Sequence, residues 1–220
     1  DVAPSRGLGD VYKRQLHIIT PVKDSIESTL RTAKAILDSH IDVPFLYTIY
    51  NDFSTEENTL LLEKASKEMG FTLVNLADLT THPSPNYLTV LRREQQICRE
   101  SGNHLLIVES DVTVKPDTLQ KLVEAATRLP EAGIIAAVTV DEKGDINYPY
   151  EFAQKLEAGV HDIHKHLSFC CTLLTNELLE KVDFNLLDET KNWFDVTISH
   201  ESLELSLIHI SEPTRRSYIS

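Results

Sequence analysis

His104-Leu105-Leu106-Ile107-Val108-Glu109-Ser110-Asp111 decides the fold, because this stretch is an apolar run that ends abruptly in two carboxylates. The run has the length of a buried strand, and Pro116 stands soon afterwards in a position favoured for the first residue of a helix. A buried strand, a polar loop and a helix in succession form the unit from which α/β sheets are built. The stretch therefore predicts one strand and one helix of such a sheet.

The same unit recurs three times upstream. Predicted strands cover residues 16–20, 45–50 and 71–76, and predicted helices cover about residues 24–40, 54–70 and 88–100. Gly70 and Gly102 stand where helices commonly end, and Pro21, which cannot donate to a strand ladder, predicts a loop after the first strand. The alternation predicts an α/β fold with a mostly parallel central sheet flanked by helices. Ligands of such sheets bind beyond the carboxyl ends of the strands.

The two ends of the chain do not have the character of sequence that evolved to fold. Asp10-Val11-Tyr12-Lys13-Arg14-Gln15 and Leu205-Ser206-Leu207-Ile208-His209-Ile210 can be encoded by opposite strands of one oligonucleotide. That oligonucleotide resembles a transposase adapter used in sequencing libraries. We therefore interpret residues 1–15 and 205–220 as an adapter-derived leader and tail and leave them out of the fold prediction. The natural chain is expected to continue beyond residues 16–204.

Composition limits the classes of protein that residues 16–204 can represent. Their length suits one domain with a sizeable core. The net charge of −13 disfavours a nucleic-acid partner, because binding one requires Lys and Arg to neutralise phosphates. The three cysteines, Cys98, Cys170 and Cys171, form no Cys-x-x-Cys pair, which suits a reducing compartment. No apolar run approaches the roughly twenty residues that span a bilayer. We expect a cytoplasmic domain, with peripheral association at the inner face of the membrane left open.

Polar residues follow three of the predicted strands, as Thr20-Pro21, Asn51-Asp52-Phe53-Ser54-Thr55 and Glu109-Ser110-Asp111. A single polar strand end is more often a solvated turn, since Asp, Asn and Ser satisfy the hydrogen bonds of turns. The order of all three, with Lys115-Pro116-Asp117 behind the third, resembles the pattern of family-two glycosyltransferases, which have the Rossmann-like GT-A fold. The resemblance covers nearly all of residues 16–204.

This resemblance implies a hexosyltransferase-like enzyme that moves a sugar from a nucleotide-diphosphate donor and inverts the anomeric carbon. The implied acceptor is a saccharide, a lipid-linked molecule or a protein, as in polysaccharide biosynthesis. The resemblance also implies which residues contact the nucleotide sugar: Thr20, Pro21, Asn51, Asp52, Arg93, Glu109 and Ser110. An exposed position on a helix surface is the alternative interpretation of Arg93.

Three positions depart from the family pattern. Asn51 stands where the family has an aspartate, Phe53 replaces a glycine, and Glu109 replaces the first aspartate of Asp-x-Asp. An amide can still hydrogen-bond a base or a ribose hydroxyl, and a glutamate is still a hard oxygen ligand. The departures therefore bear on donor specificity more than on donor binding.

The resemblance assigns the metal and the catalytic base to acidic residues. Asp111, with Glu109, would hold Mg²⁺ or Mn²⁺, which bridges the two phosphates and stabilises the charge of the leaving group. Asp195 occupies the place of the base that takes the proton of the acceptor hydroxyl. Trp193 and Phe194 beside it are explained either by stacking on a sugar or by ordinary packing.

Two other features carry no predicted chemistry. Residues 161–166 hold three histidines but lack a second ligand cluster, so they are interpreted as an acceptor-side loop. Cys170 and Cys171 lie in an apolar run and are predicted to be buried.

Two other functions compete with transfer. A catalytically inactive sugar-nucleotide-binding homologue is suggested by Asn51 and Glu109. A sugar-1-phosphate nucleotidyltransferase is disfavoured, since residues 20–24 contain no glycine.

Overall fold

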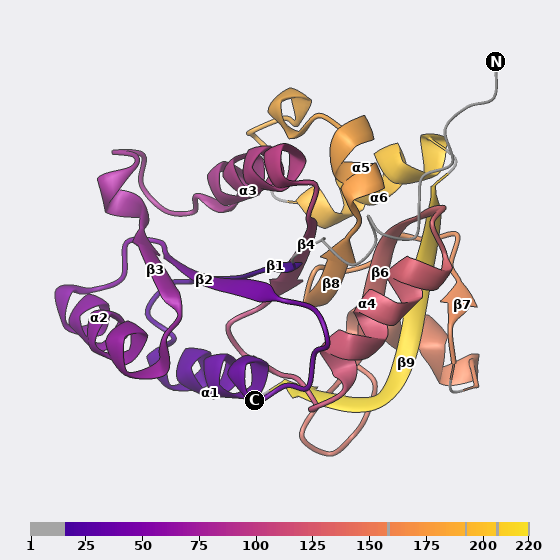
Figure 1. Ribbon diagram of the computed structural model, residues 1–220, viewed down its shortest axis with the longest axis horizontal. Helices are drawn as coiled ribbons and strands as arrows, with labels where there is room; N and C mark the ends of the chain where they lie inside the picture. The colour runs from indigo at the N-terminus through magenta and orange to yellow at the C-terminus, as the bar shows by residue number, and fades with distance from the viewer. Residues whose placement is uncertain (1–15, 158, 192, 206, 220) are drawn as a thin grey trace.

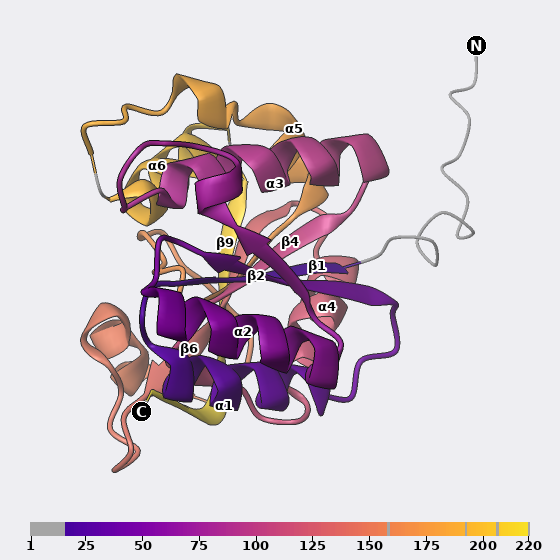
Figure 2. The same ribbon diagram turned by 90° about the vertical axis from the view of Figure 1, so that its left-hand side faces the viewer.

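A central sheet divides the computed structural model into two helical layers (Figures 1 and 2). The structure describes residues 16–157, 159–191, 193–205 and 207–219. The strands lie in the order β3 (Thr72–Asn75), β2 (Phe45–Asn51), β1 (Leu16–Val22), β4 (His104–Val108), β8 (Cys171–Leu174), β6 (Ala132–Val140), β9 (Ile208–Ile219) and β5 (Val112–Thr113). A short strand, β7 (His161–Asp162), pairs with β9.

The first four strands of this order are parallel, as predicted. β1 pairs in parallel with β2 and with β4, and β2 pairs in parallel with β3. β8 is antiparallel to both of its neighbours, β4 and β6, so β6 runs in the same direction as the first four strands. The predicted mostly parallel α/β sheet is therefore confirmed.

The helices form one layer on each face of the sheet. One layer holds α1 (Ile26–Leu37), α2 (Glu56–Met69) and α4 (Thr118–Arg128), and the other holds α3 (Tyr87–Ser101), α5 (Asn176–Lys181) and α6 (Phe194–Glu204) (Figure 2). Gly70 and Gly102 end α2 and α3 in left-handed conformations, with φ of 85° and 70°. Three short 3₁₀ segments, Leu76–Asp78, Tyr148–Lys155 and Phe184–Leu186, lie between these elements. Across the described part of the chain, no helix has both the length and the apolar composition needed to cross a bilayer.

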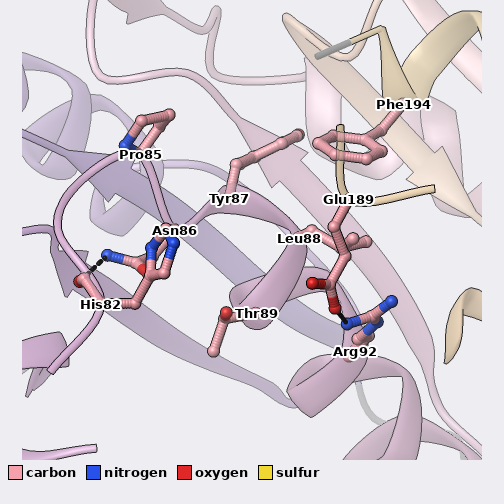
Figure 3. A pocket seen from close by; sticks show the side chains of 9 residues that line it. All are labelled: His82, Pro85, Asn86, Tyr87, Leu88, Thr89, Arg92, Glu189 and Phe194. Atoms are coloured by element: carbon pink, nitrogen blue, oxygen red, sulfur yellow. Dashed lines mark hydrogen bonds and ion pairs between the residues drawn. The ribbon is translucent and has the colours of Figure 1, made fainter. Parts of the chain in front are cut away.

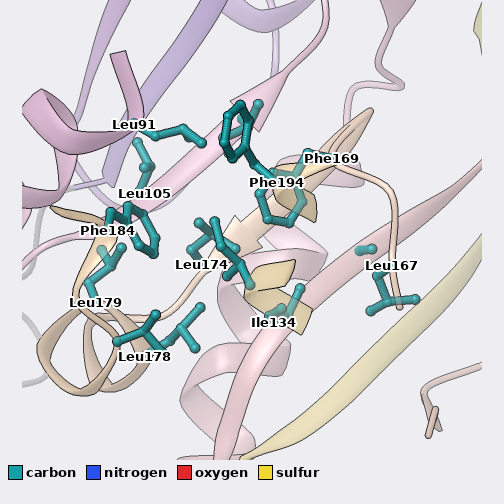
Figure 4. Close-up of a cluster of buried hydrophobic side chains, with 14 of the residues drawn as sticks. Leu91, Leu105, Ile134, Leu167, Phe169, Leu174, Leu178, Leu179, Phe184 and Phe194 are labelled. Carbon is teal, nitrogen blue, oxygen red and sulfur yellow. The ribbon is translucent and has the colours of Figure 1, made fainter. Parts of the chain in front are cut away.

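Strand side chains alternate between the two layers, and this alternation builds two hydrophobic clusters. Leu105 and Ile107 of β4 belong to the cluster under α3, α5 and α6, whereas Leu106 belongs to the cluster under α1, α2 and α4. Figure 4 shows the first cluster, in which Leu91 from α3, Phe184 and Phe194 meet the side chains of the sheet. Because both faces are covered, the central strands β4 and β6 are almost wholly buried, and polar side chains gather beyond the strand ends.

Two boundaries and one region differ from the sequence prediction. β1 continues through Pro21 to Val22, because these residues still pair with Tyr50 and Asn51 of β2. α4 begins at Thr118, two residues after Pro116, which lies in the preceding turn. β6 was not predicted, and β8 was predicted only as buried packing; Cys171 is fully buried there and Cys170 nearly so. Residues 161–166 form β7 and a loop.

Most of the predicted adapter-derived tail, residues 205–220, forms β9. It pairs in parallel with β6 and in antiparallel with β5 and β7. The edge of an open sheet carries unpaired backbone groups that accept an extended chain of almost any sequence. The strand pairing therefore does not decide whether the tail is adapter-derived, and the leader, residues 1–15, lies outside the described residues.

Candidate active site

The carboxyl ends of β1, β2 and β4 meet at one edge of the sheet, because β1 is parallel to both of its neighbours. The predicted residues that follow these strands are therefore brought together in two groups. One group follows β1 and β2, and the other follows β4 and faces the start of α6.

The turn after β2 is held by hydrogen bonds within the protein. The Asn51 amide donates to Thr59 and to Asn75, both at 2.9 Å, and its oxygen accepts from the Ser54 amide at 3.2 Å. Phe53 takes a φ of 57°, a conformation that glycine adopts without cost, which explains the glycine of the similar family at this position. Asn51 is 3% exposed, so its side chain supports the turn from inside.

Asp52 holds the loop in front of α3. One carboxylate oxygen accepts from the Ser84 hydroxyl and from the Asn86 amide, both at 2.8 Å. The other oxygen accepts from the Asn86 side chain at 2.8 Å. Asp52 thus orders residues 84–86, which line a cavity together with Pro21 and Asp52 itself. Thr20 lies deeper: it is fully buried and accepts from the Tyr47 hydroxyl at 3.0 Å.

Glu109 and Asp111 lie in a tight turn between β4 and β5. The Glu109 amide donates to the Cys170 carbonyl at 2.9 Å, and the Val112 amide donates to the Glu109 carbonyl at 3.1 Å. The Ser110 carbonyl accepts from the Thr32 hydroxyl at 3.1 Å, which ties the turn to α1. Burial raises the pKa of the Glu109 carboxyl, a hydrogen bond with Cys170 opposes the rise, and the charges of Asp111 and Asp195 add to it. The Glu109 residue as a whole is nevertheless exposed, so water reaches this turn.

Asp195 lies in the first turn of α6, and its charge acts on Glu109. Burial raises the pKa of its carboxyl, while the Val196 amide, which donates at 2.8 Å, and the charge of His166 oppose the rise. None of the ion pairs among the described residues involves Glu109, Asp111 or Asp195. The three carboxylates thus lie near one another without an ion pair, and His166 is a basic group whose charge acts on Asp195.

Tyr87, at the start of α3, faces these carboxylates. Burial raises the pKa of its hydroxyl far above the usual value, and the charges of Glu109 and Asp195 add to the rise. Its ring packs against that of Phe194, with centroids 6.3 Å apart. Tyr87 and His166 were not predicted as site residues, because neither stands directly after a predicted strand.

A second cavity opens beside Tyr87 and Phe194 (Figure 3). Its volume of about 360 Å³ falls within the range of roughly 300–1,000 Å³ that small-molecule sites occupy. Figure 3 shows the two aromatic rings on one side and the ion pair of Arg92 with Glu189 on another. The cavity therefore combines apolar faces with hydrogen-bonding groups, a combination that suits a sugar.

Arg93 is exposed on α3 and reaches the hydroxyl of Tyr50. Its neighbour Arg92 lines the second cavity and donates to the carbonyls of Phe184 and Leu187. The contact of Arg93 with donor phosphates stays a prediction.

A different group among the described residues also has the composition of a metal site. The ligand atoms of His17, Glu94 and Cys98 lie within 4.8 Å of one another between β1 and α3. Glu94 already accepts hydrogen bonds from His17, at 3.1 Å, and from the Tyr50 hydroxyl. These bonds satisfy the group without an ion, and it lies away from the carboxyl edge of the sheet. Glu109 and Asp111, by contrast, offer hard oxygen ligands after β4, and the charge of Asp111 raises the pKa of Glu109.

The fold is shared with solved glycosyltransferases. S. aureus TarS 1–349 matches with a TM-score of 0.68 and 13% identity, over 94% of this chain and 60% of that one. The mannosyltransferase PcManGT from Pyrobaculum calidifontis, in complex with GDP-Man and Mn²⁺, matches with a TM-score of 0.64 and 15% identity, over 94% and 57%. TarS 1–349 in complex with UDP-GlcNAc matches with a TM-score of 0.63 and 14% identity, over 93% and 58%.

These matches confirm the predicted GT-A α/β fold. The chain spans less than two thirds of the length of each of these proteins. No protein-family model matches the chain, and no curated protein is similar enough in sequence to count as a relative.

Proposed function

We propose that this chain is an inverting, metal-dependent glycosyltransferase that moves a sugar from a nucleoside-diphosphate donor to an acceptor hydroxyl. The observation that carries the proposal is that Glu109, Asp111 and Asp195 lie near enough at the carboxyl edge of a GT-A sheet for the charges of the two aspartates to raise the pKa of Glu109. None of the three forms an ion pair among the described residues, so a cation and a substrate are the groups that would complete the site.

The donor is assigned to the cleft between β1, β2 and α3. Pro21 and the loop held by Asp52 line the cavity proposed for the nucleoside, while Thr20 and Asn51 support its walls from inside the protein. Glu109 and Asp111 would hold Mg²⁺ or Mn²⁺, with Ser110 between them positioning the turn. The ion would supply positive charge that stabilises the diphosphate as the bond to the sugar breaks.

Asp195 is proposed as the general base. A single displacement with inversion requires a base on the acceptor side that takes the hydroxyl proton as the oxygen attacks the anomeric carbon. The raised pKa of Asp195 suits this task, since a base is most effective when its pKa lies closer to the working pH. Trp193, which is 72% exposed beside it, offers a face for an acceptor sugar.

The finer assignments follow from the same proposal. The acceptor would be a saccharide, a lipid-linked molecule or a protein, and the acidic charge argues against nucleic acid. We propose a cytoplasmic role in polysaccharide assembly, with membrane association only at the surface. The rival function is nucleotide-sugar binding without transfer, which is suggested by Asn51 and Glu109 in place of the aspartates of the similar family.

Calorimetry with UDP, GDP, UDP-GlcNAc and GDP-Man tests the proposal in the presence and absence of Mn²⁺. We expect one nucleoside diphosphate to bind, at least tenfold more tightly with Mn²⁺, and Asp111→Asn to abolish the dependence on metal while preserving the shape of the side chain. Asp38→Asn, at the far end of α1, makes the same change of charge and should bind like the parent. Equal dependence on Mn²⁺ in Asp111→Asn removes Asp111 from the metal site.

Release of nucleoside diphosphate from the bound donor then separates transfer from binding alone. Incubation with saccharide, lipid-linked and peptide acceptors should give release that depends on one acceptor. Tight donor binding without any release, in any acceptor mixture, would favour the inactive homologue.

A further inference from the structure

The hydroxyl of Tyr87 is a buried donor that the protein leaves without a partner. Four buried side-chain atoms of the described residues have no hydrogen-bond partner, and Tyr87 Oη is the one at the candidate active site. An unpaired buried hydroxyl is unfavourable, and such groups are rare in folded proteins. Where such a group persists at a functional site, a bound ligand commonly supplies its missing hydrogen-bond partner.

Tyr87 also stands at the boundary between the two cavities. It lines the cavity formed with Pro21 and Asp52, and it lines the cavity formed with Arg92, Glu189 and Phe194. Figure 3 shows its side chain extending from the start of α3 toward Phe194, the neighbour of Asp195. Tyr87 therefore stands between the cavity proposed for the nucleoside and Phe194, the neighbour of the proposed base.

The surroundings fix the hydroxyl as a donor. Burial and the charges of Glu109 and Asp195 raise the pKa of Tyr87, so the hydroxyl keeps its proton at any working pH. A phenol in this state cannot serve as a base, but it can donate one hydrogen bond. The ligand that satisfies it must offer an uncharged or weakly charged oxygen, because Glu109 and Asp195 repel a further anion.

We propose that Tyr87 recognises the transferred sugar, by donating a hydrogen bond to one of its oxygens between the nucleoside cavity and Asp195. The inference rests on the proposed function, since it takes the donor and the base in the positions given above. Tyr87 would turn its ring slightly from Phe194 to reach the sugar. It would be a specificity-determining residue that touches the donor sugar and leaves the nucleotide untouched.

The test compares two affinities in one variant. In the presence of Mn²⁺, Tyr87→Phe should bind UDP or GDP as the parent does, and bind the matching UDP-GlcNAc or GDP-Man more weakly by about three- to tenfold. A residue with a purely structural role would lower both affinities together. Tyr148→Phe removes the same atom from an exposed ring and should change neither affinity.

Thermal unfolding of the ligand-free variants gives the second readout. Tyr87→Phe should keep or raise the melting temperature, because it removes an unpaired buried hydroxyl. Tyr150→Phe should lower it, because the Tyr150 hydroxyl donates to the Ser168 carbonyl at 2.7 Å. A clear fall in the melting temperature of Tyr87→Phe would assign its hydroxyl to the folded core and overturn the inference.

The remaining outcomes are also decisive. If the parent binds no nucleoside diphosphate, the proposed function fails and the inference loses its premise. If the parent binds the diphosphate, the function stands, and the inference alone is overturned when the sugar adds nothing to the affinity or when Tyr87→Phe keeps the parental ratio.

Discussion

The turn after β2 and the region between β4 and α6 both place acidic side chains at the same edge of the sheet, but the surroundings of these side chains differ. Asp52 has hydrogen bonds from Ser84 and Asn86 on its two oxygens. Burial raises the pKa of the Glu109 and Asp195 carboxyls instead, and at Glu109 the charges of Asp111 and Asp195 add to the rise. A carboxylate at the end of a strand can thus form hydrogen bonds within the protein, or it can be left available for a ligand.

The difference shows why position alone does not assign a role. An ionised carboxylate is stable where protein donors surround it, and this is the situation of Asp52. A carboxylate that is buried with few donors costs free energy, which the fold must supply elsewhere. The predictions that follow test this contrast, beginning with the largest expected effect.

Asp195→Asn should lower the turnover number by about a hundredfold to ten-thousandfold, the usual cost of removing a general base. Donor affinity should stay near the parental value, because the base acts mainly in the transition state. The measurement is nucleoside diphosphate release with the acceptor found in the screen, alongside calorimetry of the donor. A variant that turns over at the parental rate would remove Asp195 from the mechanism.

The pH profile sharpens this result. Since the pKa of Asp195 is raised from the usual 3.8, the base becomes protonated at a higher pH than an ordinary aspartate does. Turnover by the parent should fall as the pH decreases through that raised value, and the residual rate of Asp195→Asn should lack this acid limb.

Stability should respond with opposite signs at the two places. Asp52→Asn loses charge-assisted hydrogen bonds and puts an amide against donors, at a cost of about 1–3 kcal/mol. The melting temperature should fall by several degrees, since about 1 kcal/mol shifts it by roughly 2–4 °C in a domain of this size. Asp195→Asn removes a charge that burial disfavours, so the melting temperature of this variant should equal or exceed that of the parent at pH 7.

The pH dependence of stability gives a control for the expected effect of Asp195→Asn. A carboxyl with a raised folded-state pKa stabilises the fold fully below its unfolded pKa, and this contribution is lost as the pH rises through the folded value. Any gain from Asp195→Asn should therefore shrink as the pH is lowered toward the usual 3.8. Equal destabilisation by both variants at pH 7 would show that the two carboxylates are held alike.

The sequence predicted the regular half of the fold well. β1 to β4 and α1 to α3 were predicted within a few residues, because each strand is continuously apolar and each helix has a capping residue or a glycine end. The boundary at Pro21 was wrong, since register with β2 outweighed the missing amide of the proline. β6 was missed although it follows α4, and β8 lies antiparallel between β4 and β6, a pairing that depends on contacts distant in the sequence.

The candidate site was predicted in part, for the same reason. Glu109 and Asp111 follow a strand, so their position could be anticipated, and their convergence with Asp195 agrees with the prediction without testing its role. Nothing local to Tyr87 distinguishes it from a helix residue that packs on the core. Its meaning comes from an absent hydrogen bond and from residues more than a hundred positions away, and those are properties of the folded chain.

The smallest expected effect concerns the backbone hydrogen bonds between β9 and its neighbours at the edge of the sheet. As with the two carboxylates, the test is whether these bonds contribute to the stability of the fold. A chain trimmed to residues 16–207 keeps Leu207, which is buried in the cluster under α3, and removes β9. If the tail is adapter-derived, its pairing with β6 was not selected, and water can satisfy the exposed edge. The free energy of unfolding should then change by less than about 0.5 kcal/mol, the usual limit for changes outside the core.

Chemical denaturation of both chains measures this difference, and the denaturant slope should fall slightly, since less surface is exposed on unfolding. A loss of several kcal/mol would make β9 a working part of the sheet and contradict the adapter interpretation of residues 205–220.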